Sequence, residues 1–585
     1  MATHRHCSSG GPVLIVLAWM VSLTAPAAAD ISGFVREEGT GVPIPGARVH
    51  VQADPASPVV VSAADGSFTL PVNPSGMVMV TAAVEYDRSA AVNYATGGVL
   101  AGDGQAGVTI SLLTIPAADD PTYQIFLPQV ADCGNCHEEQ QAEWLLSNHA
   151  TAGGDVWVRD LFSGDGTPGG GGGYVFLDTH DPGETGFCAT CHTPMADVFD
   201  PGNVMLNEVD SPAALEGISC IACHQIDSVN DNVQALHHLG NSTYRFPDGR
   251  PYIPTQEFVW GPLDDIAFGG MKASNAPLFS ESLLCASCHE YNRPGTDVPG
   301  QTTYSEWLAS PYAVPGDGFR SCQDCHMPEA DSPGYLVDPI GGPPLRPGGQ
   351  IHSHELEGAA PGELEEHVHL VTAVSEVGSG LIVRCEVTNE TGHAFPTGVS
   401  PRNALLVIEA SWHGLPLQQT SGPTVPFWGS DDVPGVQDGD YAGRPGAGFA
   451  RVLEGRINDQ GPVVRPVLFI DGEAVYEDTL IPSGATDVTE VVLAVPAAAQ
   501  SGDEVMVEAR LLYRRAWRAL AVTKGWQTTP QGGPIEIEVA RTVDTVTLTQ
   551  SGGGVPIPAT RPLAAGLLIV LIAALAMVML RGGRW

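Results

Sequence analysis

Five copies of the pattern Cys-x-x-Cys-His constrain this chain more than any other feature of its sequence. The paired thiols are Cys133 and Cys136, Cys188 and Cys191, Cys220 and Cys223, Cys285 and Cys288, and Cys322 and Cys325, and the histidines that follow them are His137, His192, His224, His289 and His326. Two thiols at this spacing reach the two vinyl groups of one porphyrin, and the adjoining imidazole then turns onto the iron. The pattern therefore predicts five covalently attached c-type haems.

A lone copy of the pattern would leave two other interpretations open, a redox-active Cys-x-x-Cys and half of a zinc site. Five copies favour haem, because even one chance match is expected in roughly a hundredth of chains with this cysteine content. Ten of the twelve cysteines belong to the motifs, so no disulfide framework is left to build. Cys385 stands alone in a strand pattern, and we expect a buried thiol that packs as a small hydrophobe.

Both ends of the chain carry apolar segments. Residues 1–29 combine a basic start, an apolar run and a small-residue stretch, as in a cleaved secretory signal peptide. The run is short for the alternative, an N-terminal membrane anchor. After a linker at 549–561, residues 562–580 predict a single transmembrane helix, with a buried soluble helix as the alternative. Arg581 and Arg584 place its end in the cytoplasm, so we expect an exported protein on the periplasmic or cell-surface side, anchored in the cytoplasmic membrane.

The charge of the chain limits its partners. The formal net charge is −41, and the sequence contains only two lysines, Lys272 and Lys524. Binding to nucleic acid needs a basic surface, so nucleic acid is excluded as a partner. The negative field would attract a cationic redox partner protein, although acidity that serves solubility alone explains the composition as well.

The length predicts three or four domains, and the patterns divide the chain accordingly. Residues 31–115 show short alternating strands between Pro-Gly and Asp-Gly turns, which predict a β-sandwich. Residues 118–358 form the five-haem region, expected to be helix and loop, in which Gly169–Gly173 predicts a flexible loop. Residues 364–548 return to a strand pattern and predict a C-terminal β-rich domain.

A degenerate repeat lies inside the haem region. Glu143–Ala150 aligns with Glu306–Ala313, which places His149 opposite Tyr312. If the chain from Glu138 is helical, His149 lies about 18 Å from His137 along the axis, too far to share one iron. His149 is therefore expected to serve a neighbouring haem. Tyr312 is expected to pack, with iron ligation as the alternative.

The chain holds enough other histidines to give every iron a second imidazole. Ten remain besides the motif histidines and those in the leader and first sandwich: His149, His180, His237, His238, His352, His354, His367, His369, His393 and His413. His393 lies in a turn rich in glycine and proline, which indicates an iron ligand, or else hydrogen bonding within the turn. Irons with two imidazoles exchange electrons without binding substrate, so no catalytic residue is predicted.

Two segments resemble known families. The order of the Ile31–Val35 strand, the Pro43–Ala47 turn and the Ala64–Leu70 hairpin resembles the carboxypeptidase regulatory-like β-sandwich, which implies a spacer or binding module. The C-terminal Val-Pro signature, apolar helix and arginine tail are similar to exosortase-type sorting signals, which implies that the helix is processed.

The motif region resembles the multihaem cytochromes c around cytochrome c-554 and hydroxylamine oxidoreductase. The likeness rests on Trp144–Ala150, Glu216–His224, Cys285–Glu290, Tyr304–Tyr312 and Cys322–Pro328. It implies closely stacked haems whose distal histidines come from distant sequence, with His149, His354 and His393 the first candidates and His237 or His238 next.

A comparison with related haem enzymes bears on whether this chain is catalytic. Pentahaem nitrite reductases typically replace one motif histidine by lysine, whereas all five motifs here end in histidine, and hydroxylamine oxidoreductase carries eight attachment sites. The sequence therefore favours a membrane-tethered electron carrier. One alternative is an oxidoreductase that acts on a small nitrogen or sulfur species at an open haem. Another is a surface adhesion protein in which the haems have only a structural role.

Overall fold

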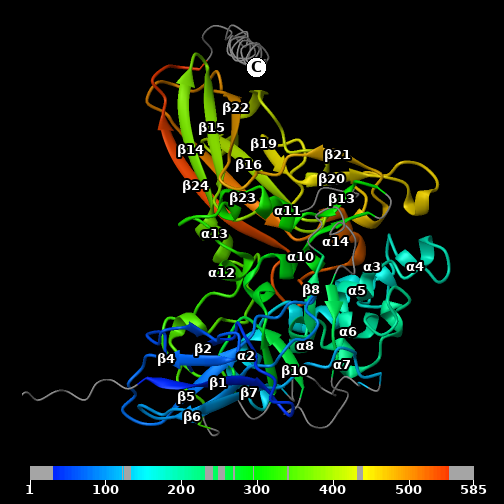
Figure 1. Ribbon diagram of the computed structural model, residues 1–585. Coiled ribbons are helices and arrows are strands. Elements are labelled where there is room, and N and C mark those ends of the chain that lie inside the picture. Colours follow the sequence, from blue (N-terminus) through cyan, green and yellow to red (C-terminus); the bar gives the residue numbers. More distant parts are fainter. Residues whose placement is uncertain are drawn as a thin grey trace, which may run out of the picture. The chain divides into compact units, whose positions relative to one another are not determined.

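The computed structural model describes residues 30–121, 123, 133–230, 242–247, 257–267, 271–293, 296–338, 342–430 and 439–552. The expected signal peptide, the apolar segment 562–580, His237 and His238 lie outside these ranges. Within them, no helix has the length and apolar character needed to cross a bilayer. The chain is multidomain, with N-terminal and C-terminal β-rich regions and a helical motif region between them in sequence (Figure 1).

The first of two compact units contains the described residues up to Val84, together with Tyr94–Thr114 and Asp264–Ala267. Its sheets have the strand orders β4-β1-β7 and β3-β2-β5-β6. Alternate residues of both sheets form one apolar core, including Val35, Val49 and Ile110. The strands are β1 (Ile31–Glu37), β2 (Arg48–Val51), β3 (Val60–Val61), β4 (Ser67–Leu70), β5 (Val78–Ala83), β6 (Gly97–Ala101) and β7 (Val108–Leu112). The β-sandwich expected from the strand pattern is thus present.

Asp264 joins this first unit from far along the chain. It accepts hydrogen bonds from Arg48 Nε (2.7 Å) and His50 Nε2 (3.0 Å). Burial alone would raise the pKa of Asp264, but these two partners lower it to about 2. The same contact raises the pKa of His50. His50 is therefore a structural partner of Asp264.

Replacing Asp264 with asparagine is expected to lower the pKa of His50, because the hydrogen bond to a carboxylate is lost and burial then dominates. Asp264 contributes stability above its unfolded pKa near 4, and this contribution disappears as the pH falls toward about 2. Histidine NMR titration of the full chain measures the pKa of His50. An unchanged value in the variant would contradict the pairing.

The motif region belongs to the second unit and consists of short helices joined by turns and small β-ladders. Its helices are α2 (Glu138–Trp144), η1 (His149–Gly154), α3 (Val156–Phe162), α4 (Phe176–Thr179), α5 (Cys188–His192), α6 (Pro194–Asp197), η2 (Leu206–Glu208), α7 (Pro212–Leu215), α8 (Cys220–His224), η4 (Pro277–Ser280), α10 (Leu283–His289), α11 (Thr303–Leu308), η5 (Pro311–Ala313), α12 (Cys322–His326), η7 (Gly348–Gln350) and α13 (Glu363–His367). Its strands are β8 (Ile226–Val229), β9 (Ser242–Tyr244), β10 (Phe258–Gly261), β11 (Lys272–Asn275), β12 (Tyr291–Asn292) and β13 (Pro299–Gln301). The helix expected from Glu138 to Asn148 is α2, but it ends at Trp144, and His149 begins the separate element η1.

The C-terminal region, also in the second unit, contains two sheets with the orders β14-β15-β22-β18 and β17-β16-β23-β24, the latter with β19 paired to β16. Cys385 on β15 is fully buried in the core between them, as predicted. The elements are β14 (Val368–Val377), β15 (Gly380–Asn389), β16 (Asn403–Trp412), β17 (Leu415–Pro416), β18 (Gln418–Ser421), η8 (Phe427–Gly429), β19 (Gly446–Phe449), β20 (Arg451–Glu454), η9 (Ile457–Asp459), η10 (Phe469–Asp471), β21 (Ala474–Asp478), β22 (Thr486–Ala494), β23 (Glu504–Arg514), α14 (Arg518–Lys524) and β24 (Glu536–Thr547).

Gly169–Gly173 was expected to be a flexible loop, and this expectation is wrong. The loop packs against the end of α14, where a Cβ on Gly169 would lie 2.3 Å from the Lys524 carbonyl oxygen and one on Gly172 would lie 2.5 Å from that of Thr523. Side chains would not fit between the two backbones. The glycines therefore allow a close backbone approach to α14.

Candidate haem-binding site

Each of the last four motifs forms one turn of helix, on α5, α8, α10 and α12, and in the first motif Cys133 is helical while His137 directly precedes α2. Residues three apart in a helix lie on the same side, one turn from each other. Both thiols of a motif therefore face the same way. Figure 1 shows these motif helices between the loops of the central region.

The motif histidines share one hydrogen-bonding arrangement. In four of them Nδ1 lies within hydrogen-bond distance of a backbone carbonyl, which can only accept, so the proton resides on Nδ1 and Nε2 is left as a metal ligand. In the fourth motif, Nδ1 of His289 faces the side-chain amide of Gln301 at 3.0 Å. The carbonyl contacts join His137 to Leu336 (2.6 Å), His192 to Ala152 (3.2 Å), His224 to Trp260 (2.7 Å) and His326 to Glu357 (2.6 Å).

Two further histidines face motif histidines. The ring centres of His149 and His289 are 6.3 Å apart, and those of His326 and His393 are 6.4 Å apart with the planes inclined by only 6°. A histidine–metal bond is about 2 Å long, and the ring centre lies about 1 Å beyond the nitrogen, so two axial imidazoles on one metal have centres about 6 Å apart. Both pairs have this spacing.

Burial keeps these imidazoles neutral, the form that binds a metal. It lowers the pKa of His149 and of His393 to about 4 and that of His289 to about 3. Nδ1 of His149 is buried and has no hydrogen-bond partner among the described residues. His393 is oriented by its Nδ1, which lies 3.0 Å from the Ala394 carbonyl oxygen.

A second group of histidines surrounds His354. Burial, followed by the nearby His224, His352 and His137, lowers the pKa of His354 to about 4. Nδ1 of His354 lies 3.0 Å from the His352 carbonyl, and Nδ1 of His352 lies 2.8 Å from the Met327 carbonyl. Both therefore keep Nε2 as the ligand nitrogen. His352 was among the ten histidines available from the sequence, but it was not one of the distal candidates that the resemblance favoured.

The thiols of different motifs adjoin one another. Cys133 interacts with Cys220, Cys191 with Cys288, and Cys285 with Cys322. The fourth motif therefore has the second and fifth as neighbours, and the first lies next to the third. Such contacts place thiols of different motifs side by side.

The family described as Cytochrome c554 and c-prime has a model that matches residues 132–225, which contain the first three motifs. The motif region is that of a multihaem c-type cytochrome. A crystal structure of a penta-heme cytochrome c552 from Thermochromatium tepidum is similar to 73% of this chain and to 100% of its own, with 19% sequence identity and a TM-score of 0.49. No curated protein matches the sequence significantly.

The cytochrome region binds c-type haem, and it exposes several large apolar side chains. Leucines of the repeat are solvent-exposed there, with 57% for Leu145, 74% for Leu146 and 47% for Leu308. Phe187, which directly precedes Cys188, is also exposed. Exposed apolar side chains are what a porphyrin would cover when it binds.

Other candidate histidines of the cytochrome region are engaged elsewhere. Nε2 of His180 lies 3.0 Å from Asp471, and its Nδ1 lies 3.3 Å from the Phe176 carbonyl, so both ring nitrogens bind protein. Nε2 of His369 contacts Glu390 at the surface. The Tyr312 hydroxyl donates to the Glu390 carbonyl (2.9 Å), which supports packing over iron ligation.

Proposed function

We propose that this protein is a membrane-tethered electron-transfer relay with five c-type haems, each held by two thioethers and a motif histidine. When bound, the haems supply reversible one-electron chemistry at iron. The observation that carries the proposal is the pairing of imidazole rings at metal-bridging distance, His149 with His289 and His326 with His393. Iron with two imidazoles passes electrons and leaves no position for a substrate.

The distal ligands follow from these neighbours. His149 serves the iron of His289, and His393 serves that of His326. His354 would serve the iron of His224, because Glu143 accepts from the His354 amide while the adjacent Trp144 donates to the Ile218 carbonyl, two residues before the third motif. His352 is a candidate for another iron, as are His237 and His238, which lie outside the described residues.

The contacts between motifs support a relay rather than isolated centres. The fourth motif adjoins the second and the fifth through its two cysteines, and Cys288 also acts on Cys223 of the third. The first motif adjoins the third. Haems held at these motifs would therefore form a chain of neighbours that runs from the first motif through the third and fourth to the second and the fifth.

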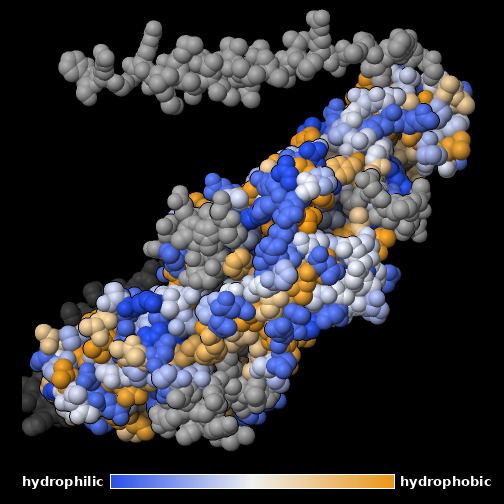
Figure 2. All heavy atoms as spheres, turned by 90° about the vertical axis from the view of Figure 1, so that its right-hand side faces the viewer, coloured by the Kyte–Doolittle hydropathy of each residue, from blue (hydrophilic) through white to orange (hydrophobic). Residues whose placement is uncertain are grey.

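The tether and partner remain proposals from the sequence. The apolar segment 562–580 would anchor the relay on the periplasmic or cell-surface side, and a net charge of −41 would attract a cationic redox partner. Hydrophilic and hydrophobic residues are interspersed on the face shown in Figure 2, which suits a transient encounter with such a partner. The N-terminal sandwich would act as a carboxypeptidase regulatory-like spacer.

Electron paramagnetic resonance of the purified oxidised protein tests the relay. We expect low-spin ferric iron to dominate, and the reduced protein to bind little carbon monoxide, because both axial positions are filled. Signals dominated by high-spin iron, with stoichiometric carbon monoxide binding, would overturn the proposal. They would favour an oxidoreductase that acts on a small nitrogen or sulfur species at an open haem.

A further inference from the structure

The two copies of the internal repeat make the same contacts with two different motifs. Trp144 Nε1 donates to the Ile218 carbonyl (2.7 Å), and the Ile218 amide donates to the His149 carbonyl (3.1 Å). Ile218 lies two residues before Cys220, the first cysteine of the third motif. Copy one is thus bonded to the chain that enters this motif.

In copy two, Trp307 Nε1 donates to the Arg320 carbonyl (2.8 Å), and the Arg320 amide donates to the Tyr312 carbonyl (2.9 Å). Arg320 lies two residues before Cys322, the first cysteine of the fifth motif. The repeat therefore recurs in hydrogen bonds as well as in sequence.

The glutamate before each tryptophan reaches a segment that carries a distal histidine. Glu143 Oε2 accepts from the His354 amide at 2.9 Å. Glu306 Oε2 accepts from the Thr397 hydroxyl at 2.6 Å, in the segment that carries His393, and the Ala394 amide of the same segment lowers the pKa of Glu306. Each copy therefore binds a motif through its tryptophan and a distal histidine segment through its glutamate.

We infer that Glu143 and Glu306 are positioning residues, which hold the His354 and His393 segments opposite the third and fifth motifs. This inference rests on the proposed function, since it concerns axial ligands of a relay. The second repeat copy supports the inference for the first. Its Glu306 and Trp307 join the segments of His393 and His326, and the rings of these two histidines are 6.4 Å apart and nearly parallel. Glu143 and Trp144 join the segments of His354 and His224 in the same way.

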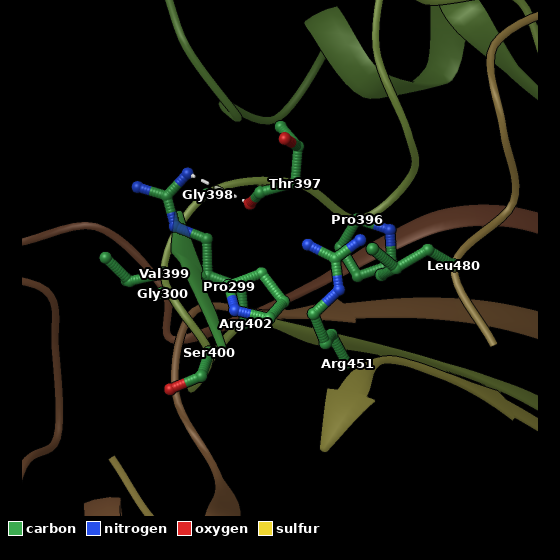
Figure 3. A pocket seen from close by; sticks show the side chains of 10 residues that line it. All are labelled: Pro299, Gly300, Pro396, Thr397, Gly398, Val399, Ser400, Arg402, Arg451 and Leu480. Atoms are coloured by element: carbon green, nitrogen blue, oxygen red, sulfur yellow. Dashed lines mark hydrogen bonds between the residues drawn. The ribbon is translucent and has the colours of Figure 1, made fainter. Parts of the chain in front are cut away.

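The Glu306 carboxylate is held in turn by its surroundings. Oε1 accepts from the Thr302 hydroxyl (2.8 Å) and lies 3.4 Å from Arg451. Figure 3 shows the turn beyond Pro396, with the Arg402 side chain directed at the Thr397 carbonyl and Arg451 nearby. Glu306 thus has partners on both oxygens, whereas the Glu143 carboxylate has one hydrogen-bond partner among the described residues, the His354 amide.

The experiment compares spin state and carbon monoxide binding among variants of the full-length holoprotein. Glu143→Ala and Glu306→Ala are each expected to raise the carbon monoxide-binding fraction of one haem about tenfold, the equivalent of about 1.4 kcal/mol, with the number of attached haems unchanged by mass. Glu143→Gln should behave as wild type, because the amide oxygen still accepts from the His354 amide. Glu139→Ala, on the same helix but exposed, is the matched control.

Several results would overturn the inference. They are unchanged spin states in both alanine variants, equal effects of Glu143→Gln and Glu143→Ala, and a general loss of haem instead of a change at one iron. Each of these would leave the relay intact if the wild type is low-spin. A high-spin wild type would instead contradict the proposed function itself.

Discussion

Replacing His149 with alanine is expected to convert one low-spin iron per chain to the high-spin state. The centres of the His149 and His289 rings lie 6.3 Å apart. The buried Nδ1 of His149 has no hydrogen-bond partner among the described residues. Removing the imidazole opens one axial position of the fourth haem. The oxidised protein should then show a high-spin resonance, and the reduced protein should bind one equivalent of carbon monoxide.

The double variant His149→Ala, His393→Ala tests the pairing as well as the ligation. His149 faces His289 and His393 faces His326, so two irons should open, and the two effects should add. A single open iron in the double variant would mean that only one of the two histidines is an axial ligand. His369→Ala is the control, because its ring contacts Glu390 at the surface, and it should leave all spin states unchanged.

Methionine at position 149 gives an independent readout. A thioether keeps the iron six-coordinate, and axial His/Met ligation raises the reduction potential compared with two imidazoles. Potentiometry should therefore show one couple displaced upward while the number of low-spin irons is conserved. Unchanged couples would show that His149 does not touch iron.

The haem motifs could be found in the sequence because their chemistry is local. Two thiols and an imidazole must lie within five consecutive residues, so the pattern is visible without the fold. The β-sandwich pattern at 31–115 is local in the same sense, and the structure shows the expected two sheets. Cys385 was also predictable, since alternation along β15 places it in the core.

The distal side of each haem depends on contacts between distant residues, so sequence could only provide candidates. The resemblance favoured His149 over His180, but only the structure shows why: His180 is bound at both nitrogens by Asp471 and Phe176, while His149 faces His289. The repeat did contain one further signal. Glu143 and Glu306 occupy equivalent positions in its two copies, and we aligned them without predicting the hydrogen bonds that they make.

The Gly169–Gly173 loop is a second case in which contacts between distant residues decide the structure. A run of glycines has high backbone freedom in isolation, so a flexible loop was the natural prediction. The residue that fixes it, Lys524, is about 350 positions away and belongs to the C-terminal region. Only the folded chain brings the two together.

Replacing Lys524 with methionine is expected to produce the largest loss of stability of any single substitution considered. Its ammonium group is fully buried and donates to three backbone carbonyls, those of Asp160 (2.7 Å), Gly170 (2.6 Å) and Tyr174 (2.6 Å). Methionine fills a similar volume but cannot donate. Each buried carbonyl left without a donor costs about 1–3 kcal/mol, so the three together should lower the free energy of unfolding by at least about 3 kcal/mol.

The loss should be local before it is global. Asp160 also accepts from Trp526 Nε1 (2.7 Å), and Trp526 stacks on Trp157 with ring centres 4.2 Å apart, so α3, the glycine loop and the end of α14 form one packed cluster. Hydrogen exchange should therefore accelerate first across the glycine loop and α3, and the thermal midpoint should fall. The second motif lies just beyond this loop in the chain, so its haem should become the most easily lost.

Lys272→Met is the matched control, because Lys272 is the only other lysine and is partly exposed on β11. It should leave the thermal midpoint and the exchange of the glycine loop unchanged. Equal behaviour of the two variants would show that the three carbonyls do not depend on the buried ammonium. A lower midpoint for Lys524→Met without faster exchange in the loop would show that Lys524 acts on the C-terminal sheets instead, and that the C-terminal region does not hold the second haem motif in place.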